Sequence, residues 1–216
     1  VKDSLSNTDS GELSILKDAT APVIDWAALD TPNDSAVQTI SANISDALSA
    51  INSVSLSVDG SVSELALTNG SVSTEISLTE GSHELTLSAV DALANTSTET
   101  QTILIDLTAP IVVLDSLLNL TNDSNFTVSG SASDAVSGLA SLIITHNENS
   151  AATVSVSESL FSQAFTLVEG KNTFTVLATD NVGRTTSVIH TVNSDFTAPV
   201  IVIDNTELIF VADQTY

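Results

Sequence analysis

Apolar and polar residues alternate with a period of two along much of the chain. The pattern is clearest at residues 53–58, 84–89 and 172–176, where Val, Leu, Ala or Phe alternates with Ser, Thr or Glu. Such alternation is typical of strands with one face in a core and the other in water. Asp59-Gly60, Asn69-Gly70, Glu80-Gly81 and Glu169-Gly170 lie between these segments and supply the positive φ that tight turns need. The sequence shows no helical stripe and therefore predicts an all-β chain.

The chain repeats itself at a spacing of about 88 residues. Thr20-Ala21-Pro22 recurs as Thr108-Ala109-Pro110 and Thr197-Ala198-Pro199, and Ser45-Asp46-Ala47 recurs as Ser133-Asp134-Ala135. We therefore predict two complete repeats, 20–107 and 108–196. Residues 1–19 match the tail of a repeat, its F-G loop and strand G, and residues 197–216 match the first strands of a further repeat. We expect the chain to be part of a longer array of such repeats.

About seven short strands in each repeat are the signature of an immunoglobulin-like sandwich with Greek-key links. Successive repeats are joined by almost no linker, because strand G of the first runs through Thr108-Ala109-Pro110 into strand A of the second. Proline fixes its own φ and restricts the residue before it. The sequence thus predicts tandem immunoglobulin-like β-sandwich repeats arranged as a rod.

These motifs resemble the bacterial Ig-like tandem repeats of large extracellular adhesins. The resemblance lies in the Thr-Ala-Pro that opens a strand, the Ser-Asp-Ala loop, Glu-Gly before a strand, and an Asp that begins a five-residue hairpin. In that family the hairpin usually reads Asp-x-x-Gly-Asn. Here residues 91–95 lack the glycine and residues 180–184 lack the asparagine, so we expect the hairpin geometry to differ between the repeats. The resemblance implies a protein that is secreted or held on the bacterial cell surface.

The charge of the chain excludes several classes of partner. Asp and Glu number 27 against four Lys and Arg, which gives a net charge of −23. Nucleic acid and anionic membrane surfaces are poor partners for such a chain, because phosphate binding needs a basic patch. Cysteine is absent, which excludes disulfides and zinc-thiolate sites. The aliphatic runs are far shorter than the ~20 residues that span a bilayer, so no membrane insertion is expected in this segment.

The sandwich topology places three aspartates together at the start of each repeat. One comes from the preceding linker, one from the B-C loop and one from the F-G loop: Asp18, Asp46 and Asp91 for the first repeat, and Asp106, Asp134 and Asp180 for the second. Glu80 lies at the other end of the first repeat, and Asp30 and Asp34 are weaker candidates. Two carboxylates about 6 Å apart repel by roughly 3 kcal/mol at an effective dielectric near 20. Calcium bound by several oxygens would reverse that repulsion.

Two interpretations of these aspartates stay open. Each carboxylate can cap nearby backbone amides in an Asx-turn, with no metal involved. Alternatively, the recurrence of all three at matching positions favours calcium, and the resemblance points the same way, since some of these adhesin arrays carry calcium at their joints. Magnesium fits less well because it prefers a small octahedral shell and retains water.

The sequence gives less support to other functions. The three histidines occupy positions that are not histidine in the other repeat, and no Ser/His/Asp set or phosphate loop is evident, so we expect no enzymatic activity. Core positions are predicted for Trp26, Phe126, Phe161, Phe165 and Phe174. Acceptor triplets for N-glycosylation occur at Asn33, Asn43, Asn69, Asn95, Asn119, Asn122 and Asn125. Glycan attachment is most plausible at Asn119, Asn122 and Asn125.

The sequence therefore favours a structural stalk or spacer segment of a long bacterial adhesin, stiffened by calcium at the joints between neighbouring repeats. The alternative is a segment of a self-assembling extracellular filament. In that case residues 12–17 and 207–211, which belong to incomplete repeats, would pair as strands with other copies of the chain.

Overall fold

The computed structural model of the chain describes Ser4 and residues 17–148 and 150–202. Of the predicted tail at residues 1–19, only Ser4 and residues 17–19 are described. The strand expected at 12–17, apart from Lys17, and the strand expected at 207–211 lie outside the described residues. The described part contains strands and connecting loops but no helix, so it has no helix that is long and apolar enough to cross a membrane. The prediction of an all-β chain is confirmed.

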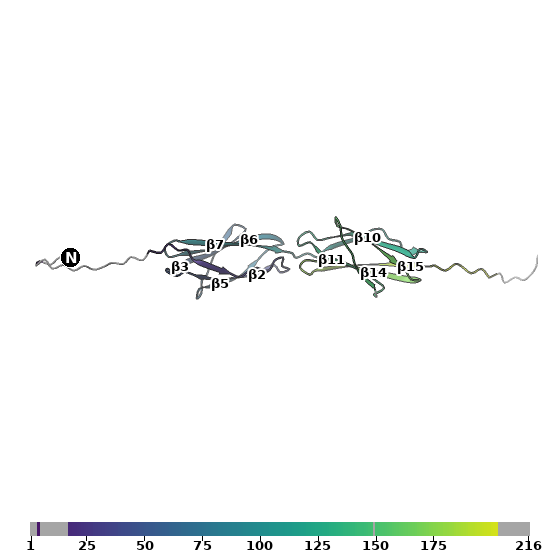
Figure 1. The fold of residues 1–216 in the computed structure, drawn as a ribbon, viewed down its shortest axis with the longest axis horizontal. Helices are drawn as coiled ribbons and strands as arrows, with labels where there is room; N and C mark the ends of the chain where they lie inside the picture. Colours follow the sequence, from purple (N-terminus) through teal and green to yellow (C-terminus); the bar gives the residue numbers. More distant parts are fainter. Residues whose placement is uncertain (1–3, 5–16, 149, 203–216) are drawn as a thin grey trace, which may run out of the picture. The chain divides into compact units, whose positions relative to one another are not determined.

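Seven strands of the first repeat form two sheets. They are β1 (Val23–Trp26), β2 (Val37–Ser45), β3 (Ile51–Val58), β4 (Ser61–Leu65), β5 (Ser71–Ser77), β6 (Gly81–Asp91) and β7 (Thr96–Ile105). One sheet has the order β1-β2-β5 and the other the order β4-β3-β6-β7, and the pairs within them are antiparallel. Figure 1 shows β6 and β7 on one side of this sandwich and β2 and β5 on the other.

Eight strands of the second repeat form a second pair of sheets. They are β8 (Ile111–Leu114), β9 (Leu120–Thr121), β10 (Asn125–Ser133), β11 (Leu139–His146), β12 (Ser150–Thr153), β13 (Leu160–Thr166), β14 (Gly170–Asp180) and β15 (Thr185–Ser194). Their orders are β13-β10-β8 and β12-β11-β14-β15-β9, in which the short β9 pairs with β15 in parallel. Each sheet therefore takes all its strands from one predicted repeat.

The chain divides into two compact units that do not coincide with the sequence repeats. The first unit contains residues 1–111 together with the loop regions 133–141 and 178–186, and the second contains the remaining residues. The boundaries of the repeats at 107/108 and 196/197 stay predictions.

The core of the first sandwich follows from the alternating pattern. In β2 every second residue is buried, and the facing strands bury Leu56, Leu85, Leu87 and Ile103 completely. Full burial of one such side chain stabilises the fold by about 1.5–3 kcal/mol. Trp26 is only 8% exposed, at the core position that the alternation predicts.

The core of the second sandwich contains a stack of rings. Phe174 is fully buried, and its ring centroid lies 4.5 Å from that of His146, 5.0 Å from that of Phe165 and 5.5 Å from that of Phe126. His146 also forms a 2.8 Å hydrogen bond from Nε2 to Oδ1 of the buried Asn172. The ring of His146 is thus held by core contacts.

The prediction that the two β6–β7 and β14–β15 hairpins differ in geometry is wrong. In the first, the Asp91 N–H donates to the Asn95 carbonyl at 3.0 Å, and in the second the Asp180 N–H donates to the Arg184 carbonyl at 3.1 Å. The fourth residue of each hairpin has positive φ, +65° at Ala94 and +90° at Gly183. Alanine therefore adopts the conformation for which glycine is usual, because the same hydrogen bonds fix the backbone.

Candidate cation sites

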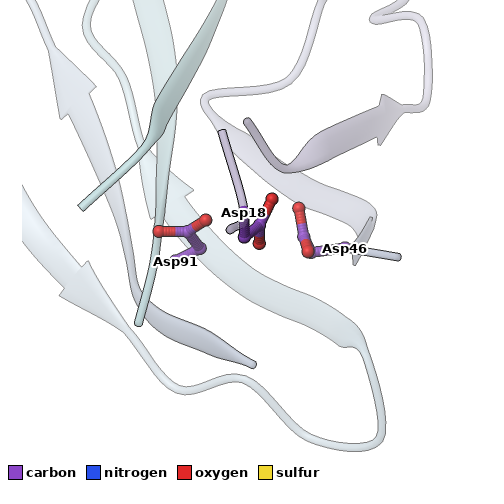
Figure 2. Close-up of side chains that lie close together, drawn as sticks. All are labelled: Asp18, Asp46 and Asp91. Atoms are coloured by element: carbon purple, nitrogen blue, oxygen red, sulfur yellow. The ribbon is translucent and has the colours of Figure 1, made fainter. Parts of the chain in front are cut away.

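The first aspartate cluster, cluster 1, consists of Asp18, Asp46 and Asp91. Asp18 lies in the segment before β1, Asp46 follows β2 and Asp91 is the last residue of β6. One carboxylate oxygen from each lies within 4.8 Å of the others. Figure 2 shows the Asp18 side chain between those of Asp46 and Asp91. The antiparallel fold brings the end of β2 and the end of β6 to one end of the sandwich, beside the incoming chain.

The second cluster, cluster 2, consists of Asp106, Asp134 and Asp180. These residues follow β7, follow β10 and end β14, so they repeat the arrangement of cluster 1. Their oxygens also lie within 4.8 Å of one another. All three residues belong to the same compact unit.

One oxygen of each carboxylate caps a turn, as the Asx-turn interpretation requires. Oδ1 of Asp46 accepts the N–H groups of Leu48 and Ser49 at 2.9 and 2.8 Å. Oδ1 of Asp91 accepts those of Leu93 and Asn95, both at 2.8 Å. The corresponding bonds recur in cluster 2, where Oδ1 of Asp134 and Oδ1 of Asp180 each accept two backbone N–H groups.

The second oxygens do not all find partners. Oδ2 of Asp18 and Oδ2 of Asp180 are buried and accept no hydrogen bond in the described part of the chain. Their residues are 8% and 2% exposed. A buried charged oxygen without a partner is costly, and most buried polar atoms in proteins are paired. Several carboxylate oxygens around one point are the ligands that calcium prefers, so both clusters fit that ion.

Hydrogen bonding keeps three of these aspartates ionised. Bonds from the Thr20 hydroxyl and N–H hold the pKa of Asp18 below its usual range. Burial opposes ionisation of Asp91, but bonds from Asn95, Ser49 and Leu93 outweigh it and lower the pKa of that carboxyl. Asp106 behaves in the same way: burial is outweighed by bonds from the Ser137 N–H and from Thr108, and its pKa is lowered. Both clusters therefore hold fixed negative charge at neutral pH.

No Lys, Arg or His side chain in the described residues forms an ion pair with either cluster. The one ion pair among them joins His83 to Asp59, through Nδ1 and Oδ2 at 2.6 Å, outside both clusters. Two unit charges 4.8 Å apart repel by about 3.5 kcal/mol at a dielectric near 20 and by about 0.9 kcal/mol in water. The folded chain thus brings together groups that a divalent cation would stabilise.

The other predicted ligands lie elsewhere. Glu80 is exposed and outside both clusters, where its Oε1 accepts a 3.0 Å hydrogen bond from the Thr108 hydroxyl. The same hydroxyl lies 3.5 Å from Oδ1 of Asp106, and a role for Glu80 as a ligand stays a prediction. Asp30 and Asp34 are exposed and join neither cluster.

Sequence reasoning missed a third copy of the linker aspartate. Asp195 has the place of Asp106 one repeat later, and its Oδ1 accepts the N–H and hydroxyl of Thr197, at 3.1 and 2.9 Å. These bonds lower the pKa of Asp195. The shared signal is Asp-x-Thr-Ala-Pro, which occurs at Asp18, Asp106 and Asp195. In all three places the N–H and the hydroxyl of the threonine donate to Oδ1 of the aspartate.

The histidines are engaged in structural contacts. His83 bridges Asp59 and the Thr79 carbonyl, at 2.6 and 2.9 Å. His190 lies 2.9 Å from the Leu118 carbonyl oxygen and stacks on Phe126.

The second repeat matches a known family in sequence. The family model described as glucodextranase, domain B, matches residues 114–196. No curated protein matches the sequence.

Solved structures resemble the chain in fold. Immunoglobulin domains 1–5 of Sidekick-1 match with 12% identity and a TM-score of 0.53, over 83% of this chain and 40% of that one. A tetra-tandem repeat from the extending region of a large adhesion protein matches with 22% identity and a TM-score of 0.38, over 82% and 50%. A 1.5-MDa bacterial ice-binding adhesin matches with 14% identity and a TM-score of 0.41, over 84% and 67%. The predicted immunoglobulin-like sandwich fold is confirmed.

Proposed function

We propose that this chain is a spacer segment of a long bacterial adhesin outside the cell, and that calcium bound at clusters 1 and 2 stiffens the joints between its repeats. The observation that carries the proposal is the composition of each cluster. One ligand, Asp18 or Asp106, stands in the linker two residues before Thr-Ala-Pro, and the other two stand in loops of the sandwich that follows. An ion shared by all three would fasten the linker to that sandwich.

The chemistry of the clusters supports calcium. Their donors are oxygens, they are ionised at neutral pH, and each cluster has a buried carboxylate oxygen without a partner. When bound, calcium would supply positive charge and several coordination positions. The chain's own contribution is to hold the carboxylates by their Oδ1 turn caps, so that little conformational entropy is lost on binding.

Resemblance to adhesin repeats supports the extracellular role. Two of the similar structures come from proteins described as adhesins or adhesion proteins, and the motifs of this chain resemble those of extracellular bacterial repeats. The acidic, hydroxyl-rich composition suits a spacer, because a net charge of −23 opposes self-association. The proposal assigns the chain no catalytic step.

Calorimetric titration of the whole chain with calcium tests the binding. We expect saturable heat with dissociation constants of about 0.1–1 mM, the range of extracellular modules. The double variant Asp46→Asn, Asp134→Asn is the matched control and should give no such heat. Absence of heat from the wild-type chain would refute calcium binding.

Small-angle scattering tests the mechanical role separately. We expect the calcium-loaded chain to give a narrower distribution of maximum dimensions than the chain in a chelator, and the double variant to be insensitive to calcium. Saturable heat without a change in scattering would refute the stiffening and leave the binding.

A further inference from the structure

Clusters 1 and 2 share their backbone but differ in one side chain beside the ion-binding oxygens. The last residue of the hairpin is Asn95 at cluster 1 and Arg184 at cluster 2. In both hairpins the backbone N–H of this residue donates to Oδ1 of the cluster aspartate, at 2.8 Å. The two side chains therefore start from equivalent positions, and differences between them reflect their chemistry.

At cluster 1 the neighbouring side chains are amphoteric. Oδ2 of Asp91 accepts hydrogen bonds from Nδ2 of Asn95 at 2.7 Å and from the Ser49 hydroxyl at 2.9 Å. An amide and a hydroxyl each carry an acceptor oxygen as well as a donor. When a cation enters, both groups can turn and present oxygen to it.

At cluster 2 the corresponding side chain offers only donors. Arg184 donates from Nε to the backbone carbonyl of Asp106 at 3.2 Å and from Nη2 to that of Asp34 at 2.8 Å, and the guanidinium pairs with none of the three carboxylates. Oδ2 of Asp180 and the Ser137 hydroxyl are left buried without partners. A guanidinium is always charged and has no acceptor, so it can never ligate a cation.

The balance of charge differs accordingly. Three aspartates give each cluster a formal charge of −3, and the Arg184 guanidinium adds one positive charge beside cluster 2, where its Nε donates to the Asp106 carbonyl. Calcium affinity depends on the charge count of the site and on its ligands. The unpartnered Oδ2 of Asp180, in a residue that is 2% exposed, still provides a position for a cation at cluster 2.

We propose that Arg184 makes cluster 2 the weaker of the two calcium sites, so that the chain binds calcium first at cluster 1 and only at higher concentration at cluster 2. This inference rests on the proposed function. A joint with asparagine at the hairpin end is loaded at low calcium, and a joint with arginine is loaded later. Arg184 acts here as a tuning residue that sets the affinity of a site without contacting the ion.

Nuclear magnetic resonance of the whole chain measures the two sites separately. The Leu48 N–H donates to Asp46 and the Gly138 N–H donates to Asp134, both at 2.9 Å, so their amide resonances report clusters 1 and 2. During a calcium titration we expect the Leu48 resonance to shift with a midpoint roughly fivefold below that of Gly138. A unit charge about 8 Å from a divalent ion in water changes affinity by roughly that factor.

Exchanging the side chains tests the cause. Arg184→Asn should lower the Gly138 midpoint toward that of Leu48, and Asn95→Arg should raise the Leu48 midpoint. Arg184→Gln removes the charge more conservatively and should act in the same direction, whereas Arg184→Lys should change the midpoint little. Lys171→Asn removes an equal charge from an exposed position on β14 and should have no effect.

The outcomes separate this inference from the proposed function. Equal midpoints in the wild-type chain, a lower midpoint at Gly138, or no response to Arg184→Asn and Arg184→Gln would overturn the tuning role while calcium binding stands. No saturable shift of either resonance up to about 10 mM calcium, ten times the weakest constant expected, would overturn both.

Discussion

The Asp134→Asn variant should reverse its effect on stability when calcium is added. Without calcium, the change removes the repulsion of Asp134 from Asp106 and Asp180, whose oxygens lie within 4.8 Å. At a dielectric near 40, intermediate between surface and water, each pair contributes about 1.7 kcal/mol, so about 3.5 kcal/mol is relieved. The amide retains an acceptor for the N–H groups of Val136 and Gly138, but loss of charge weakens the two bonds by about 2 kcal/mol in total. The variant should be more stable by about 1–2 kcal/mol.

With calcium, the wild-type chain should become more stable than Asp134→Asn. Calcium at about a hundred times the dissociation constant of a site stabilises the folded chain by about 2.7 kcal/mol, and the variant loses that gain at cluster 2, which exceeds the about 1–2 kcal/mol that it gains without calcium. Scanning calorimetry of both chains, in chelator and in saturating calcium, measures the change, since 1 kcal/mol shifts the midpoint of a domain of this size by about 4–8 °C. Glu158→Gln removes an equal charge from an exposed turn and is the control. If Asp134→Asn lowers the midpoint equally in both conditions, the aspartate is a turn cap alone and the repulsion argument fails.

Three further predictions concern the sandwiches. In Gly130→Ala the added Cβ would lie 2.2 Å from the Val113 carbonyl oxygen, so we expect a loss of about 1–3 kcal/mol instead of the gain of about 0.4–1 kcal/mol that an unhindered Gly→Ala gives. Urea denaturation measures it, with Ser131→Ala as control, and a stabilised variant would contradict the close contact. Asn172→Ala removes the acceptor for His146 and for the Val168 N–H, and we expect a loss of about 2–4 kcal/mol in the same assay; a loss below about 1 kcal/mol would show that the buried network contributes little. The hydrogen bond that His83 donates to the Asp59 carboxylate raises the pKa of His83 and lowers the pKa of Asp59. The His83 contribution is complete below its unfolded pKa of about 6.5 and is lost as pH rises through the higher folded pKa, and the Asp59 contribution is lost as pH falls through its lowered pKa. Wild-type chain should therefore exceed His83→Asn in stability more at pH about 5.5 than at pH about 9, and equal differences would refute the pairing.

The elements that rest on local signals were predictable. Alternation of apolar and polar residues predicted β3, β6 and β14. Asn-Gly and Asp-Gly predicted turns, and in the structure φ is positive at both, for example +52° at Asn69 and +78° at Gly70. The repeat spacing selected the six aspartates of clusters 1 and 2. In contrast, the hairpin at Ala94 was predicted wrongly, because a local preference for glycine was outweighed by hydrogen bonds that form only when β6 and β7 pair.

Other features of the sites depend on contacts between distant segments. Asp18 and Asp91 are 73 residues apart (91 − 18), and which oxygen of each remains unpartnered depends on how Thr20, Ser49 and Asn95 pack around them. The hydrogen bond from the Thr108 hydroxyl to Glu80 likewise joins residues that are 28 positions apart and could not be read from the sequence.

The sequence by itself determined that this protein is an all-β repeat with acidic residues at fixed intervals, because a period of two, turn residues and an 88-residue spacing are properties of the chain's own order. Only the tertiary structure decided that one oxygen of the cluster carboxylates caps a turn while Oδ2 of Asp18 and of Asp180 stays buried and unpaired. It also decided that Arg184 donates to the backbone carbonyls of Asp106 and Asp34 instead of to a carboxylate. Hydrogen-bond partners are chosen by distance and direction in space, and neither is encoded in the spacing of residues along the chain.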